Sequence, residues 1–186
     1  MTRQRPERMA FLAFIALISC ASCGTDPRRQ PASHTSAGPR SGVTDAEPGA
    51  GDNATVRQSV FVPVYPFVYI EDQARPINLA ITVYVRNSDR SSPILLTAVR
   101  FHGSDGRLVH DYLAKPLRIA PLAATEFFVK QSEVAAGASA SFLIDWSADT
   151  AVSAPAIEAV MIGTQMNQGI AFTSPGRVVT EPSPSK

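Results

Sequence analysis

The sequence predicts an all-β protein whose folded part is a single antiparallel β-sandwich of the immunoglobulin-like kind, preceded by a signal peptide and a disordered linker. Short segments in which apolar and polar residues alternate recur at intervals of roughly ten residues. Turn-forming residues separate these segments, and no long segment has the apolar spacing of an amphipathic helix. We expect residues 1–19 to be a lipoprotein signal peptide, 20–58 a lipid-bearing N-terminus and linker, 59–180 the sandwich and 181–186 a frayed tail.

Composition limits the class of protein further. The chain has 186 residues, of which 45% are hydrophobic and 18% charged, and a formal net charge of +1. The length fits one domain of roughly 100–200 residues plus extra sequence. The near-neutral charge excludes a generally basic nucleic-acid-binding protein. Two cysteines exclude a disulfide-rich scaffold and a four-thiolate zinc site.

The N-terminus has the pattern of an export signal. Arg3, Arg5 and Arg8 precede an apolar stretch at residues 9–18, a length typical of signal peptides. A bilayer-spanning helix needs roughly 20 such residues, so this stretch is too short to remain as an anchor. A buried core helix is the alternative, but the charges lie on one flank only and no helical partner follows.

The leader ends in Leu17-Ile18-Ser19-Cys20, which resembles the lipobox of bacterial lipoproteins. The resemblance implies that Cys20 carries a diacylglycerol thioether, that the leader is cut after Ser19 and that the new N-terminus is acylated. Each buried methylene of such chains contributes about 0.8 kcal/mol to membrane binding. We therefore expect a lipid-anchored domain outside the cytoplasm, on the cell membrane or the outer membrane.

Cys20 and Cys23 also form a C-A-S-C motif with the spacing of redox and metal sites. A cysteine pair with this spacing indicates a redox or metal site when it lies at the start of a helix inside a folded domain. Here the pair ends a leader, which favours the lipoprotein interpretation. Cys23 as the lipid-bearing residue would place Cys20 at the branched apolar position, a poorer match.

Residues 24–58 are rich in Pro, Gly, Ser, Thr and Ala and contain no aromatic residue. Val43 and Val56 are their only branched aliphatic residues, so the segment cannot bury enough apolar surface to offset the entropy of ordering it. We expect a flexible linker that reaches about 30–35 Å and holds the domain clear of the lipid headgroups.

The sandwich begins with residues 59–70, an apolar segment interrupted by Pro63 and Pro66 that predicts an edge strand or two short strands. Residues 77–86 alternate with a period of two and end in an Asn-Ser-Asp turn. Further strands are expected at 94–101, 107–113, 125–130, 140–146, 157–164, 169–173 and 177–180. The inner faces are expected to bury Leu79, Ile81, Val83, Val99, Phe101, Phe127, Phe142, Ile144 and Met161.

Six of these segments, in their order and spacing, resemble an uncharacterised bacterial family known only as a domain of unknown function. They read VFVPVYPFVYI, NLAITVYVRNSD, TAVRFHGSDGRLVHDYL, APLAATEFFVKQSE, SFLIDWSAD and IEAVMIGTQMNQGIAFTSPGRVV. The resemblance covers the whole folded unit. It implies a small exported β domain, often with a lipoprotein-type leader, and no catalytic residues.

Two histidines offer the one alternative function. His102 and His110 flank a predicted hairpin turn and could bind a metal ion together with Asp105 or Asp111. Metal sites usually take about three or four protein ligands, and the domain has no third imidazole and no thiol. An exported metal-binding protein using these two histidines is therefore the alternative, and exposed strand-end histidines are the preferred interpretation.

The sequence contains no motif that favours an enzymatic activity. Ser104, His110 and Asp111 could be written as a triad, but adjacent His and Asp side chains on one strand point to opposite faces. The sequence also lacks a nucleophile-elbow motif and a phosphate-binding glycine loop. We expect no catalytic residues, no cofactor and no bound metal.

Aromatic residues are the remaining candidates for a binding surface. Trp146 alternates with Phe142 and is expected to fill the core, although at a strand end it could anchor a partner or a sugar. Tyr65, Phe67 and Tyr69 alternate on the proline-broken segment and are candidates for strand addition by an envelope protein, with packing on the domain's own core as the favoured alternative. We expect a non-enzymatic binding or structural module.

Overall fold

A computed structural model of the chain describes residues 41–70, 72–132, 136–165 and 168–179. These residues form strands and turns without an α-helix, and all strand pairs are antiparallel, so the predicted fold class is confirmed. Within these ranges no helix is long and apolar enough to cross a membrane.

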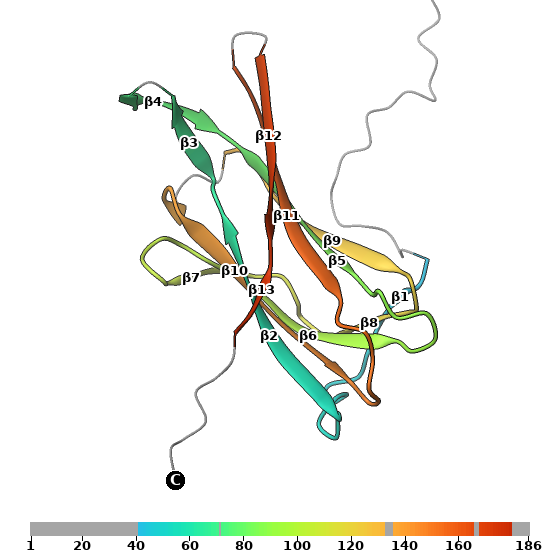
Figure 1. Ribbon diagram of the computed structural model, residues 1–186. Helices are drawn as coiled ribbons and strands as arrows, with labels where there is room; N and C mark the ends of the chain where they lie inside the picture. Colours follow the sequence, from blue (N-terminus) through green and yellow to red (C-terminus); the bar gives the residue numbers. More distant parts are fainter. Residues whose placement is uncertain (1–40, 71, 133–135, 166–167, 180–186) are drawn as a thin grey trace, which may run out of the picture. The chain divides into compact units, whose positions relative to one another are not determined.

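The strands form two main sheets and one small one (Figure 1). The first sheet contains β1 (Val43–Asp45), β2 (Val56–Val64), β6 (Ile94–His102), β7 (Leu108–Asp111), β8 (Leu117–Ile119), β10 (Ala140–Ala148) and β13 (Arg177–Val179). The second contains β5 (Ala80–Arg86), β9 (Ala124–Val129), β11 (Ala156–Gln165) and β12 (Gln168–Pro175). The small sheet pairs β3 (Phe67–Ile70) with β4 (Asp72–Asn78).

Strand order places segments that are distant in sequence side by side. The seven-stranded sheet has the order β1-β8-β6-β10-β2-β13, with β7 paired to β6. The four-stranded sheet has the order β12-β11-β5-β9. The first strand of the domain core, β2, therefore lies between two strands from the C-terminal half of the chain.

One hydrophobic core lies between the two main sheets, because alternate residues of the long strands face inward. Phe101 of β6 and Phe142 of β10 are fully buried, and their ring centroids are 5.0 Å apart. Burying one such side chain contributes about 1.5–3 kcal/mol. All nine residues predicted to be buried lie in this core: Leu79, Ile81, Val83, Val99, Phe101, Phe127, Phe142, Ile144 and Met161.

Gly176 carries the chain from one sheet to the other. Before it, β12 pairs with β11 in the four-stranded sheet, and after it, β13 pairs with β2 in the seven-stranded sheet. The Gly176 N–H donates to the carbonyl oxygen of Ile157 at 2.8 Å. A Cβ at this position would lie 2.6 Å from Val60 Cγ1, so only glycine lets the crossing strand approach β2 this closely.

β2 differs from the predicted edge strand. It is hydrogen-bonded to β10 on one side and to β13 on the other. β13 pairs only with Ser59–Phe61, so Pro63, which has no N–H to donate, lies beyond that part of the ladder. The segment breaks at Pro66, after which β3 begins, so the alternative prediction of two strands in residues 59–70 is the correct one.

The strands also begin earlier than the predicted limit at residue 59. β1 lies within the predicted linker and pairs with β8, with Val43 opposite Ile119. Val43 and Val56, the two branched aliphatic residues of that segment, are partly buried against the core. These two side chains, the β1–β8 ladder and the hydrogen bond from the Ala46 N–H to the carbonyl oxygen of Pro116 attach the segment to the sheet.

Candidate functional site

β3 and β4 form a two-stranded ribbon that follows β2 and leads into β5 (Figure 1). Tyr69 of β3 lies opposite Pro76 of β4. At the base of the ribbon the Leu79 N–H donates to the carbonyl oxygen of Pro66 at 2.8 Å. Among the described residues, β3 pairs with β4 alone, so its other edge presents main-chain groups that an added strand can use.

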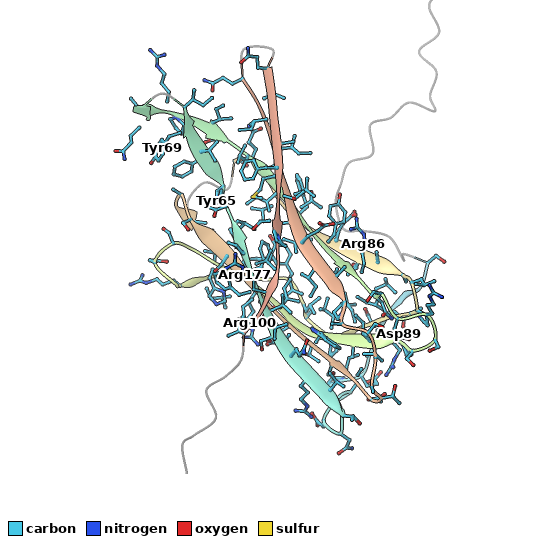
Figure 2. All side chains as sticks on the ribbon, viewed as in Figure 1. Tyr65, Tyr69, Arg86, Asp89, Arg100 and Arg177 are labelled. Atoms are coloured by element: carbon cyan, nitrogen blue, oxygen red, sulfur yellow. The ribbon has the colours of Figure 1, made fainter. Side chains whose placement is uncertain are left out.

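The predicted aromatic stripe is divided between the core and the surface. Tyr65 is partly buried, with its ring centroid 6.1 Å from that of Phe172, and its N–H donates to Met161 Sδ at 3.4 Å. Phe67 is half-buried and meets the Tyr69 ring edge-on at 5.5 Å. Tyr69 itself is 48% exposed, and Figure 2 shows it farther out on the ribbon than Tyr65. Tyr65 therefore packs on the domain's own core, as the favoured alternative predicted, whereas Tyr69 is exposed at the surface.

A cavity of about 420 Å³ lies between the ribbon and the β11–β12 hairpin. Gly163 of β11 lies close to the chain that enters β5, since a Cβ there would lie 2.6 Å from Leu79 Cδ2. The β5–β11 ladder ends at the pair Ile162–Ala80, and the cavity lies beyond Gly163. The lining combines three isoleucines with polar residues: Ile70, Arg75, Ile77, Gln165, Gln168, Gly169 and Ile170. A cavity of this size accommodates one apolar side chain of a partner or a small ligand.

The two candidate metal-binding histidines lie on opposite faces of the seven-stranded sheet. His110 is opposite Phe101, a core residue, and directly opposed residues of an antiparallel pair share a face. Its ring packs edge-on against Tyr112 at 4.5 Å. His102 follows Phe101 on β6 and is opposite Ser141, on the other face. In the part of the chain that the structure describes, no three His, Cys, Asp or Glu side chains form a group that could hold a metal ion.

Asp105 and Asp111 accept hydrogen bonds from the backbone of their own turns. Asp105 Oδ1 accepts from the Arg107 N–H at 3.0 Å, and Asp111 Oδ1 from the Leu113 N–H at 3.2 Å. Both are Asx-type interactions that fix a turn. Ser104 packs against Gly137, where an added Cβ would lie only 2.1 Å from the Ser104 hydroxyl oxygen. These contacts give the three residues local structural roles.

Trp146 fills the core, as the preferred interpretation predicted, and is 2% exposed. Its neighbour Asp145 lies on the outer face of the sheet, where its carboxylate accepts from Ser59 Oγ at 2.6 Å and from Arg100 Nη2 at 2.7 Å. Asp145 and Arg100 are both partly exposed, so this ion pair contributes modestly to stability. Arg177 of β13 lies in the same cross-strand row as Arg100, because Arg177 is opposite Phe61, and Phe61 and Arg100 are both opposite Leu143 (Figure 2).

The Asn-Ser-Asp turn after β5 connects several loops. Asn87 is buried, and its side-chain N–H groups donate to the carbonyl oxygens of Ser92, Ile119 and Ala120. Asp89 Oδ2 accepts from the Ser153 N–H at 3.0 Å.

Asp89 Oδ1 accepts from the backbone N–H groups of Ser91 and Ser92, at 2.9 and 2.8 Å. These backbone hydrogen bonds, led by that of Ser153, hold the pKa of Asp89 well below its ordinary value of 3.8. The turn signal in the sequence is confirmed, although the sequence did not indicate that it joins three loops.

Cys20, the expected lipid-bearing residue, and Cys23 lie outside the described residues.

Comparison with known proteins adds a family but no activity. A family model described as "Protein of unknown function (DUF3124)" matches residues 57–179, which confirms the resemblance to an uncharacterised family. No curated protein matches the chain significantly. The crystal structure of Thermotoga maritima 1070 is similar over 64% of this chain and 92% of its own, at 12% sequence identity and a TM-score of 0.36. A similarity this weak supports no further argument.

Proposed function

Because the chain belongs to a family described only as a protein of unknown function (DUF3124), we propose its function from its own residues: it is a lipid-anchored, non-enzymatic binding module of the cell envelope. The lipid on Cys20 holds the chain on the outer side of a membrane, the Pro- and Gly-rich segment spaces the domain from the lipid, and the β3 edge binds an extended segment of an envelope protein.

The observation that carries the partner-binding role is the edge of β3. Its four residues, Phe67–Ile70, contain no charged residue and no proline, the usual means by which exposed edges are protected from strand addition. Tyr69 and Ile70 are 48% and 40% exposed beside this edge. Strand addition uses main-chain hydrogen bonds for affinity and neighbouring apolar pockets for specificity. The cavity between the ribbon and the β11–β12 hairpin supplies such a pocket at the same end of the domain.

β9, an end strand of the four-stranded sheet, differs from β3 in this respect. Tyr112 Oη lies 3.4 Å from the carbonyl oxygen of Phe128 and donates a hydrogen bond to it. The Tyr112 ring also packs edge-on against Phe127 at 5.7 Å. A side chain of the domain itself therefore occupies part of the β9 edge, which makes β3 the better acceptor of an added strand.

Photo-cross-linking tests this proposal. A photoreactive phenylalanine analogue replaces Tyr69 in the full chain, expressed in the cells that produce it. The matched control carries the same analogue at Phe128, an aromatic residue of equal exposure (50% against 48%) on a different strand. We expect one dominant adduct of defined mass from position 69 and none from position 128. Equal adducts from both positions, or none from position 69, would contradict binding at the β3 edge.

A further inference from the structure

β12 differs from the other end strands of the two main sheets in its lack of charge. Its eight residues, Gln168–Pro175, include no Asp, Glu, Lys or Arg. Each of the other three end strands carries one charged residue: Asp45 in β1, Glu126 in β9 and Arg177 in β13. Charged side chains on an exposed edge protect it from pairing with another strand. The edge of β12 lacks that protection.

The free edge of β12 presents the main-chain groups of alternate residues. Within the described ranges β12 pairs with β11 alone. The Gly176 N–H, one step beyond the pair Glu158–Pro175, donates to the carbonyl oxygen of Ile157 at 2.8 Å. Because only every second residue of an antiparallel strand bonds to a given neighbour, this bond fixes which residues of β12 direct their N–H and C=O groups away from β11. They are Gly169, Ala171 and Thr173.

The side chains along this edge are small and leave it open. Gly169, Ala171 and Thr173 are all exposed, and a Cβ added at Gly169 would meet no atom within 4 Å. Ile170 and Phe172, which alternate with them, are partly buried against the core. The inner side chains therefore hold β12 in place while its outer edge stays accessible.

A second copy of β12 fits this edge. An antiparallel pair centred on Ala171 places the two Ala171 residues opposite each other and Gly169 of each copy opposite Thr173 of the other. Every N–H of these three residues then meets a carbonyl oxygen of the other copy. Pro175, which has no N–H to donate, lies beyond the paired stretch. A two-fold contact also brings residues near its axis close to their own counterparts, where like charges would repel, and β12 carries none.

We propose that two copies of this domain pair through β12 and join their four-stranded sheets into one continuous sheet. Both ends of the joined sheet are then β9 strands. Tyr112 Oη donates to the carbonyl oxygen of Phe128 on that strand, which hinders the addition of further strands, so the assembly stops at the dimer. β3 belongs to a different sheet, and each copy therefore keeps its own β3 edge for an envelope protein.

The size of the contact sets its strength. A paired stretch over residues 168–174 is about 24 Å long at a rise of about 3.4 Å per residue, and a sheet is about 10 Å thick. The contact therefore covers roughly 240 Å² per copy, well below the roughly 800 Å² of a standard stable interface. We expect a weak dimer that is populated only at high concentration. The lipid anchor of the proposed function would raise the local concentration by holding both copies on one membrane.

Sedimentation equilibrium of the purified full chain, in detergent with micelles in excess, tests the proposal without the membrane. We expect a reversible monomer–dimer equilibrium as the protein concentration rises towards millimolar. Ala171→Lys places two like charges at the two-fold axis and should weaken the association at least tenfold. Ala124→Lys is the matched control, because Ala124 is also an exposed alanine on an end strand of the same sheet. This control should associate like the parent, and both variants should unfold at the same temperature as the parent.

Disulfide trapping in the same concentration range tests the register. In a full chain carrying Cys23→Ser, the substitution Ala171→Cys places two sulfurs across a hydrogen-bonded pair, whose Cα atoms lie about 5.5 Å apart and within the reach of a disulfide. Mild oxidation should give a covalent dimer. Thr173→Cys should not, because the two-fold places its two copies about 14 Å apart. The chain without a new cysteine measures any background from Cys20.

Four results would overturn the proposal. The first is a chain that stays monomeric at the highest concentration, and the second is an Ala171→Lys variant that associates like the parent. The third is a Thr173→Cys variant trapped as fast as Ala171→Cys, which would indicate collision or another register. The fourth is an Ala171→Cys variant that, in the cells that produce it, forms its disulfide with a different protein and not with a second copy.

Discussion

Asp89 Oδ2 accepts the backbone N–H of Ser153 at 3.0 Å, which joins the turn after β5 to the loop before β11. The carbonyl oxygen of the same residue accepts from the Leu122 N–H at 3.1 Å, in the turn before β9. One aspartate thus fixes three connections at the same end of the sandwich.

Replacing Asp89 with alanine should lower the midpoint of thermal unfolding of the full chain measurably, because four donors at Ser91, Ser92 and Ser153 lose their acceptor. Asp105→Ala is the matched control, since that exposed carboxylate holds only its own hairpin turn. An equal decrease in the two variants would show that Asp89 has no special role.

The same contacts predict a pH dependence. The folded state holds the pKa of Asp89 below its ordinary value of 3.8, so the ionised carboxylate stabilises the fold above that value. As the pH falls below about 4 towards the folded-state pKa, this contribution is lost. Denaturant unfolding at several pH values should show a constant stability difference between the parent and Asp89→Asn at neutral pH. That difference should narrow at acidic pH, and a difference that widens there would contradict the assignment.

Gly176→Ala should destabilise the domain by about 1–3 kcal/mol, the usual cost of overpacking. The added Cβ would lie 2.6 Å from Val60 Cγ1 and 3.0 Å from the carbonyl oxygen of Ile157. Gly169→Ala is the matched control on β12, because no atom lies within 4 Å of a Cβ there. Chemical denaturation of both variants measures the difference. If Gly176→Ala left the free energy of unfolding unchanged, the close contact between the crossing strand and β2 would be contradicted.

Phe142→Ala should cost about 3–5 kcal/mol, because it empties a fully buried site between the two sheets. Phe128→Ala should change stability by no more than about 0.5 kcal/mol, since the Phe128 side chain is half exposed on the outer face. Similar losses of stability in the two variants would contradict the placement of Phe142 inside the core and of Phe128 on the outer face.

Strand alternation predicted the long strands and the buried residues, because it reports which face a side chain occupies. It could not distinguish Tyr65 from Tyr69, which share one alternation. Their exposure differs because Tyr65 stays beside Phe172 whereas Tyr69 lies out on the ribbon after Pro66. Alternation shows which face of a strand a side chain occupies. How deeply that side chain is buried depends on where the chain leaves the sheet.

The pairing of Gln58 with Trp146 was beyond prediction for a related reason. Gln58 and Trp146 are far apart in the sequence and become a pair only through the register of β2 and β10. Glutamine near a strand start is unremarkable by itself, and Gln58 also fell within the predicted linker. A sequence shows neither which strands are neighbours nor which polar atoms remain without a partner once they are.

An anchored envelope domain is tested most directly by the intact mass of the protein purified from the membranes of the cells that produce it. We expect a chain that begins at Cys20 and carries a diacylglyceryl group on its sulfur and an acyl chain on its amino group. An uncut chain beginning at Met1, or a chain whose Cys20 bears no lipid, would contradict the account.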